Sequence, residues 1–153
     1  MSQNFLEAAV DKFILKVTEG LVYSGAHVWV DVGEQDCSLG ITDYAQRKDG
    51  DIVFIEFLPA EGVIEAGNPV ALYETIKAAL EVSAPFDCEL VEYNQALRER
   101  PELMNDDPYG AGWVARVVPV NHGDLEALLS PEEYFELMKE EARASSSGEV
   151  SKA

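Results

Sequence analysis

The sequence predicts a mainly β fold, a small flattened barrel or sandwich of two sheets, with a helical C-terminal segment. Roughly seven short runs of β-prone residues are separated by tight turns rich in Gly, Pro, Asn and Asp. The longest apolar runs are far too short to span a bilayer. Near the C-terminus, Ser130-Pro131-Glu132-Glu133 gives a strong helix start signal, with serine at the N-cap and an acidic residue at N3.

The first expected element covers residues 5–17. Four of its apolar residues recur near one face at helical spacing: Leu6, Val10, Phe13 and Val17. This spacing favours a helix packed on the sheet, although the part over 13–17 also fits a strand.

The next elements are short strands between turn signals. Over 27–32 every second residue is valine and Trp29 falls on the other face, which is the alternation of a strand. Thr42 is the expected N-cap of a short helix, and Gly50 ends that helix. Later strands are expected at 37–41, 52–58, 70–73, 80–84, 86–93 and 113–118, and later helices at 95–100 and from 131 onward.

Acidic residues dominate the charge. The chain has 29 of them against 11 basic residues, a formal net charge of −18. Nucleic acids and anionic membranes both require cationic patches, so neither is an expected partner. The acidity fits either a solvated surface or docking to basic faces of partner enzymes. The N-terminus lacks the basic start and long apolar stretch of a signal peptide, so a cytoplasmic protein is expected.

No catalytic or metal-binding pattern is found in the sequence. Cys37 and Cys88 have neither metal-ligand nor Cys-x-x-Cys spacing, and we expect them to be buried, reduced thiols. His27 and His122 also lack metal-ligand spacing, and there is no nucleophile–base motif or phosphate-binding glycine loop. The chain is therefore expected to be non-catalytic.

One lysine lies between two β-prone runs in the middle of the chain. Val70–Tyr73 and Leu80–Ala84 flank Lys77, and there is no other Lys or Arg between Lys48 and Arg98. If the two runs pair as a hairpin, Lys77 lies at the reversal, the most exposed point that a hairpin offers. Such a position suits an amine that reaches outward or is recognised by a modifying enzyme.

Five ordered blocks resemble the glycine cleavage system H proteins. Glu74-Thr75-Ile76-Lys77-Ala78 is similar to the family's Glu-Ser-Val-Lys-Ala lipoylation turn. The other blocks, covering about residues 21–119 with it, are His27-Val28-Trp29-Val30, Gly40-Ile41-Thr42-Asp43-Tyr44-Ala45-Gln46, Gly50-Asp51-Ile52-Val53-Phe54-Ile55-Glu56, and Asn105-Asp106-Asp107-Pro108-Tyr109-Gly110 with Gly112-Trp113. The resemblance implies the lipoyl/biotinyl, or barrel-sandwich hybrid, fold.

The resemblance also implies roles for four residues. Lys77 would carry lipoic acid as an amide, and Thr75 stands where serine is usual. Glu74 resembles part of the surface that the modifying enzyme recognises, with a solubilising turn acid as the alternative. His27 is similar to a histidine near the cleft that receives the loaded arm, with a half-buried strand histidine as the alternative.

The implied function is that of a lipoyl carrier that shuttles the aminomethyl group of glycine. Lipoate ligase or a lipoyltransferase would modify it, and its partners would be glycine decarboxylase, aminomethyltransferase and dihydrolipoamide dehydrogenase. The implied domains are an N-terminal extension (1–20), an H-protein-like lipoyl domain with C-terminal helices (21–143) and a disordered, Ser-rich tail (144–153).

Other readings stay open. Val28 in place of the family's glutamate, Leu80 in place of a small polar residue, the extension and the acidity all depart from an ordinary H protein. They fit an H-protein-like lipoate-binding protein that carries sulfur intermediates for a heterodisulfide-reductase-like complex in sulfur oxidation. A lipoyl domain of a 2-oxo-acid dehydrogenase, a biotin carrier and an unmodified interaction module fit the residues around Lys77 less well.

Overall fold

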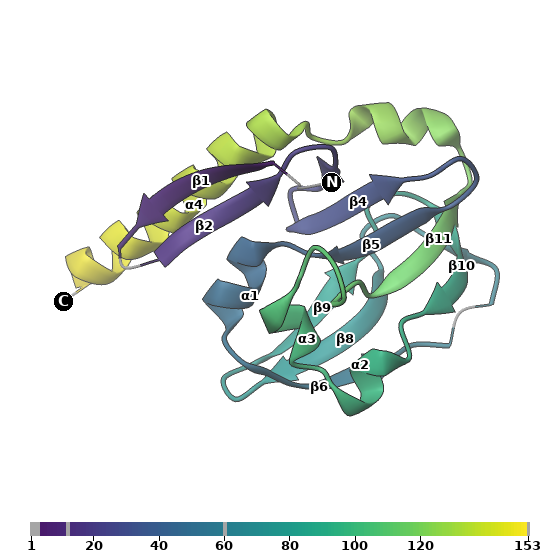
Figure 1. Ribbon diagram of the computed structural model, residues 1–153, viewed down its shortest axis with the longest axis horizontal. Coiled ribbons are helices and arrows are strands. Elements are labelled where there is room, and N and C mark those ends of the chain that lie inside the picture. Colours follow the sequence, from purple (N-terminus) through teal and green to yellow (C-terminus); the bar gives the residue numbers. More distant parts are fainter. Residues whose placement is uncertain (1–3, 12, 60, 153) are drawn as a thin grey trace.

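The computed structural model describes the backbone of residues 4–11, 13–59 and 61–152, and the described side chains end at Ser145 (Figure 1). The fold is mainly β, as predicted, with short helices and one long helix at the C-terminal side. In chain order the strands of this part are β1 (Phe5–Val10), β2 (Phe13–Thr18), β3 (Val22–Tyr23), β4 (Val28–Val32), β5 (Cys37–Ile41), β6 (Ile52–Phe57), β7 (Val63–Ile64), β8 (Pro69–Thr75), β9 (Ala79–Ser83), β10 (Cys88–Tyr93) and β11 (Ala115–Pro119).

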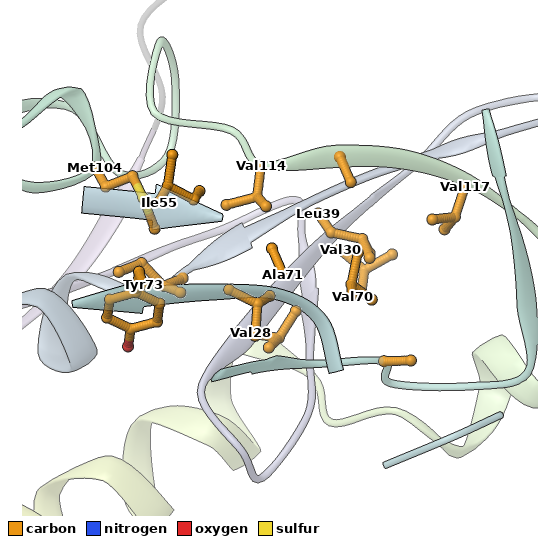
Figure 2. Close-up of a cluster of buried hydrophobic side chains, with 14 of the residues drawn as sticks. Val28, Val30, Leu39, Ile55, Val70, Ala71, Tyr73, Met104, Val114 and Val117 are labelled. Atoms are coloured by element: carbon orange, nitrogen blue, oxygen red, sulfur yellow. The ribbon is translucent and has the colours of Figure 1, made fainter. Parts of the chain in front are cut away.

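Two antiparallel sheets pack face to face as an open sandwich. The larger sheet has the strand order β3-β4-β5-β11-β10-β7, and the smaller has the order β6-β8-β9. Figure 2 shows the apolar side chains between them, with Val30 and Leu39 from the larger sheet and Val70 and Ala71 from the smaller. Burial of these aliphatic groups is the main stabilising term of the domain. The flattened sandwich that the sequence predicts is confirmed, and the sheets do not close into a barrel.

A second apolar cluster lies on the outer face of the larger sheet. There α4 (Pro131–Lys152) and the β1–β2 hairpin cover Trp29, and the rings of Tyr23 and Tyr134 stack at 4.6 Å. Trp29 pairs with Gly40 across β4 and β5. A Cβ atom at Gly40 would lie 2.5 Å from the indole, so only glycine leaves room for this ring. Both faces of β4 are therefore buried at this point.

The helix expected over 5–17 is wrong, and the chain forms a hairpin there. β1 and β2 pair from Phe5 with Thr18 to Val10 with Phe13, and Asp11 has a φ of 54° at the reversal. Alternation explains the error, because Leu15 and Val17 are buried with the exposed Lys16 between them. The apolar residues at helical spacing also fall on one face of these strands. The expectation of a strand over 13–17 is confirmed.

The remaining helices are short. They are α1 (Asp43–Asp49), α2 (Ala96–Glu99), α3 (Leu103–Asp106) and a 3-10 helix, η1 (His122–Ala127). Thr42 caps α1 as predicted, and Ser130 and Glu133 form the reciprocal capping box that starts α4. The backbone of α4 is helical as far as Lys152, where the sequence predicted disorder from 144. Within the described part of the chain, no helix combines the length and the apolar character needed to cross a membrane.

Candidate functional site: a lysine turn beside a cleft

Lys77 lies exposed in the reversal between β8 and β9, as the sequence predicts. The turn is held by Thr75, a residue that is only 8% exposed. Its Oγ1 accepts hydrogen bonds from the backbone N–H groups of Lys77 and Ala78, each at 3.2 Å, and its own N–H donates to the carbonyl of Ala78 at 2.9 Å. The backbone that carries the lysine is therefore fixed, and the side chain is free to extend.

The lysine stem runs over the corner between α1 and β6. Gly50 has a φ of +90°, and a Cβ atom built there would lie 3.7 Å from Cε of Lys77. Asn105 fixes this corner. Its Nδ2 donates to the carbonyl of Gly50 at 3.0 Å and to Oε1 of Gln46 at 3.1 Å, and its Oδ1 accepts from the N–H of Ile52 at 2.8 Å. The corner is thus stabilised by one side chain from α3, which is distant in the sequence.

Tyr73 and Asp49 add a buried polar contact near this corner. The phenol O–H of Tyr73 donates to Oδ2 of Asp49 at 2.7 Å. Burial raises the pKa of Tyr73, and the nearby Asp49 carboxylate acts in the same direction. The phenol stays neutral at physiological pH and links β8 to the end of α1.

A cleft of about 260 Å³ opens beside Lys77. Its walls come from the β1–β2 hairpin, α1 and α4, three segments far apart in the sequence (Figure 1). Over the hairpin the lining is apolar except at Asp11, and it carries further charged groups toward α1 and the lysine turn. The lining residues are Val10, Asp11, Phe13, Leu15, Tyr44, Arg47, Lys48, Lys77, Ala142 and Ser145.

Glu74 faces away from this cleft. It is exposed on the outer face of the smaller sheet, where it pairs with Phe54 on one side and Ala79 on the other. A shallow groove of about 470 Å³ lies over these strands. Its lining combines three carboxylates with apolar and aromatic side chains; the lining residues are Phe54, Glu56, Leu72, Tyr73, Glu74, Ala79, Leu80 and Glu81. The structure thus places Glu74 near the lysine turn but on a separate surface.

His27 lies one layer behind the cleft. Its ring packs edge-on against Tyr44, which lines the cleft, at 5.0 Å between ring centroids. Nε2 lies 2.7 Å from Oε2 of Glu141 and Nδ1 lies 2.8 Å from the hydroxyl of Tyr134. Burial lowers the pKa of His27, and the Glu141 carboxylate opposes that shift.

These contacts define one direction for the protons around His27. A carboxylate only accepts, so neutral His27 donates from Nε2 to Glu141 and accepts at Nδ1 from the O–H of Tyr134. The Tyr134 oxygen then accepts from the hydroxyl of Thr42 at 2.8 Å. Each hydroxyl and ring nitrogen in this series of hydrogen bonds has a partner, and the series fastens α4 to the body of the domain.

The two cysteines are buried free thiols, as expected. Burial raises the pKa of both, that of Cys88 to about 11, so neither is a thiolate at physiological pH. In the described part of the chain, no group of three or more His, Cys, Asp or Glu residues could hold a metal ion.

The roles of Asn105 and Tyr44 are not predicted from the sequence. Asn105 belongs to one of the blocks that resemble the family, and only the fold shows that its amide supports Gly50. Tyr44 belongs to another such block and forms the inner wall of the cleft. One signal in the sequence could have indicated both roles. Each residue lies in a block that resembles the family and falls outside every predicted strand.

Comparisons with known proteins agree with this geometry. The model of the family described as glycine cleavage H-protein matches residues 21–141. A glycine cleavage system H protein from Carboxydothermus hydrogenoformans is 43% identical over 125 residues, which cover 82% of this chain and 96% of the relative. A mitochondrial glycine cleavage system H protein from Mesembryanthemum crystallinum is 42% identical over 125 residues, which cover 82% of this chain and 76% of the relative. The crystal structure of a glycine cleavage system H protein from Mycobacterium marinum superimposes with a TM-score of 0.68 at 28% identity, over 84% of this chain and 97% of that one. The chain belongs to the glycine cleavage H-protein family.

Proposed function

We propose that this chain is a lipoyl carrier of glycine cleavage and that Lys77 bears the lipoyl group as an amide. The observation that carries the proposal is the exposed amine on a turn whose backbone Thr75 fixes. The surroundings fit a long acyl chain, because the lysine stem lies along Gly50 and a cleft with both apolar and charged lining residues opens next to it. Once attached, the lipoyl group supplies a dithiolane that cycles between disulfide and dithiol.

The four residues singled out in the sequence have different parts in this proposal. Lys77 is the anchor, and Thr75 holds the turn in the shape that a lipoate ligase or lipoyltransferase reads. Glu74 belongs to the surface that this enzyme contacts, since it is exposed close to the lysine. His27 affects the cleft indirectly. Its ring packs against Tyr44 and it is hydrogen-bonded to Glu141 of α4, and Tyr44 and α4 form two walls of the cleft.

The carrier role follows from reach and position. A fixed turn with a long flexible side chain presents one group at high effective concentration to whichever enzyme is docked. The partners we propose are glycine decarboxylase, aminomethyltransferase and dihydrolipoamide dehydrogenase, and the chain itself is non-catalytic. The names of the relatives favour glycine cleavage over the heterodisulfide-reductase-like partner.

Intact mass and an exchange assay test the proposal. Incubation with lipoate, ATP and a lipoate ligase should add the mass of one lipoyl group to the wild type and to Lys48→Arg, a matched change at the cleft. Lys77→Arg should gain no mass, because a guanidinium does not form the amide. The lipoylated wild type should then support glycine–bicarbonate exchange with the other three proteins. A modified Lys77→Arg variant contradicts the site, and a lipoylated chain without exchange activity contradicts glycine as the substrate.

A further inference from the structure

We infer that the open edge of β9 pairs with an extended, basic segment of the enzyme that attaches the lipoyl group. The inference rests on the proposed function, since it takes Lys77 to be the residue that this enzyme modifies. β9 begins two residues after Lys77, and in the described part of the chain β8 is its one neighbouring strand. The other side of β9 is therefore an open sheet edge next to the lysine turn.

The hydrogen-bond pattern of the hairpin shows which backbone groups point out of this edge. The N–H of Thr75 donates to the carbonyl of Ala78, and from there the two strands pair residue by residue as far as Glu81. In an antiparallel pair only every second residue bonds across, so Leu80 bonds to β8 while Ala79 and Glu81 do not. The N–H and C=O groups of Ala79 and Glu81 thus point away from the sheet, and both residues are exposed.

The opposite edge of the same sheet is closed. β6 lies at that edge, and its first N–H group, that of Ile52, donates to Oδ1 of Asn105 at 2.8 Å. α2 packs against the same strand, and its Arg98 lies over the ring of Phe57 at 5.2 Å. A further strand therefore has room beside β9 and not beside β6.

β9 also lacks the features that usually protect an open edge. Lysine, proline and β-bulges are the common ones. The five residues of β9 include neither lysine nor proline, and the one irregularity in its pairing with β8 lies between Pro69 and Ala71, far from the turn. The end of β9 beside Lys77 is regular and can accept another strand through main-chain hydrogen bonds.

Charge on the adjoining face favours a basic partner. Glu56, Glu74 and Glu81 are exposed and line the shallow groove over this sheet. None of the three forms an ion pair within the described residues. A strand added at β9 turns every second side chain toward this face, so lysine or arginine at those positions meets the carboxylates.

The same charge disfavours a second copy of this chain as the partner. Glu81 is the middle residue of β9, so two antiparallel β9 strands centred on it would place two glutamates opposite each other. Like charges in directly opposed positions destabilise a strand pair. Each chain also carries a formal net charge of −18, which adds to the repulsion.

Reach distinguishes the attaching enzyme from the enzymes that use the finished arm. Before modification the reacting atom is Nζ of Lys77, which is one lysine side chain away from the backbone. The lipoyl group adds its own length, so the later enzymes can meet its dithiolane farther from the turn. The attaching enzyme has to bring its active site to the turn itself, and the edge of β9 is the open backbone beside that turn.

Two replacements of Glu81 separate the role of the backbone from that of the side chain. Glu81→Ala removes the carboxylate and keeps the N–H group. Glu81→Pro removes both, and the lost N–H is one that β8 does not accept, so the hairpin keeps its own hydrogen bonds. Circular dichroism and urea denaturation establish that both variants are folded.

The experiment measures kcat/KM for lipoylation of the unmodified protein by a lipoate ligase with lipoate and ATP, followed by intact mass. Glu81→Pro should lower kcat/KM about five- to tenfold below Glu81→Ala, the effect of one lost backbone hydrogen bond. Glu81→Ala should fall less far below the wild type, and that smaller loss should shrink at high salt. Equal values for the two variants overturn the inference. A wild type that gains no lipoyl group counts against the proposed function alone.

Hydrogen exchange followed by NMR gives a test that needs no proline variant. Lys77→Arg gains no lipoyl group, so its complex with the ligase is not consumed. The N–H of Glu81 should exchange fast in the unbound protein and slowly in the saturated complex, while that of Leu80 is slow in both. Fast exchange at Glu81 in the complex overturns the inference. Light scattering that shows a dimer, with Glu81 protected in the unbound protein, overturns it in favour of a second copy.

Discussion

The backbone N–H of Lys77 donates a hydrogen bond to Oγ1 of Thr75, two residues earlier in the same turn, over 3.2 Å. The same oxygen accepts from Ala78, so one hydroxyl orders the whole reversal. Ile76, between them, is 86% exposed and makes the turn's most outward apolar surface. The anchor therefore depends on a polar atom that is itself buried.

Replacing Thr75 with valine is expected to loosen this turn. The variant keeps the shape of the side chain and leaves two N–H groups without their acceptor, at a cost of about 1 to 2 kcal/mol in the free energy of unfolding. Urea denaturation measures that cost, and hydrogen exchange at Lys77 and Ala78 should accelerate. Thr75→Ser retains the hydroxyl and should keep slow exchange. Slow exchange in Thr75→Val contradicts the role of the hydroxyl.

Asn105→Ala is expected to destabilise the corner beneath the lysine. It removes three hydrogen bonds at once and leaves the partly buried groups of Gly50 and Ile52 without partners. The expected loss is about 2 to 3 kcal/mol in the free energy of unfolding. Asn121→Ala, which removes the cap of η1 on the surface, should cost about 1 kcal/mol or less. Equal losses in the two variants contradict the supporting role of Asn105.

Stability should depend on pH through His27. Burial lowers its pKa in the folded state, so between that value and the unfolded value of about 6.5 the unfolded chain binds more protons. The contribution of His27 is therefore complete above about pH 6.5 and is lost as the pH falls toward the folded value. Urea denaturation at several pH values should show a smaller slope of stability against pH in His27→Gln.

NMR titration gives the pKa of His27 directly. In a His122→Gln background His27 is the one remaining imidazole, so its signal is unambiguous. Glu141 raises the pKa of His27, so Glu141→Gln should move the titration to lower pH. A shift to higher pH in this variant, or a folded pKa above 6.5, contradicts the arrangement described for the two residues.

Gly40→Ala should disrupt the packing of Trp29. The added methyl group would approach the indole to 2.5 Å, which forces the ring or β5 to move. Overpacking of this kind costs about 1 to 3 kcal/mol. Near-ultraviolet circular dichroism reports the altered indole environment. Gly25→Ala is the matched control, because a Cβ atom there meets nothing within 4 Å, and its spectrum and stability should equal those of the wild type.

The strand pattern and the lysine turn could be predicted from the sequence, because each depends on residues that are close together in the chain. The alternating valines around Trp29, the N-cap Thr42 and the two runs beside Lys77 are each visible in the sequence, and the structure confirms them. The hairpin over 5–18 was missed because its apolar residues satisfy the helical period as well as the strand period. Tertiary packing against α4 decides between the two.

The cleft could not be predicted from the sequence. Phe13, Tyr44, Lys77 and Ala142 come from four separate segments, and no spacing in the chain indicates that they meet. The hydrogen-bond partners of His27 could not be predicted for the same reason. Its partners Tyr134 and Glu141 lie more than a hundred residues away, at 107 and 114 positions along the chain.

If Lys77 carries the lipoyl group as proposed, the fixed reversal at Thr75 to Ala78 also limits how partner enzymes share the carrier. Its backbone does not swing, so the attachment point is a single pivot at one end of β8 and β9. Every enzyme that needs the group on Lys77 has to approach that same end of the molecule. Two such enzymes could not use one carrier molecule at the same time, so they would compete for it when the carrier is scarce.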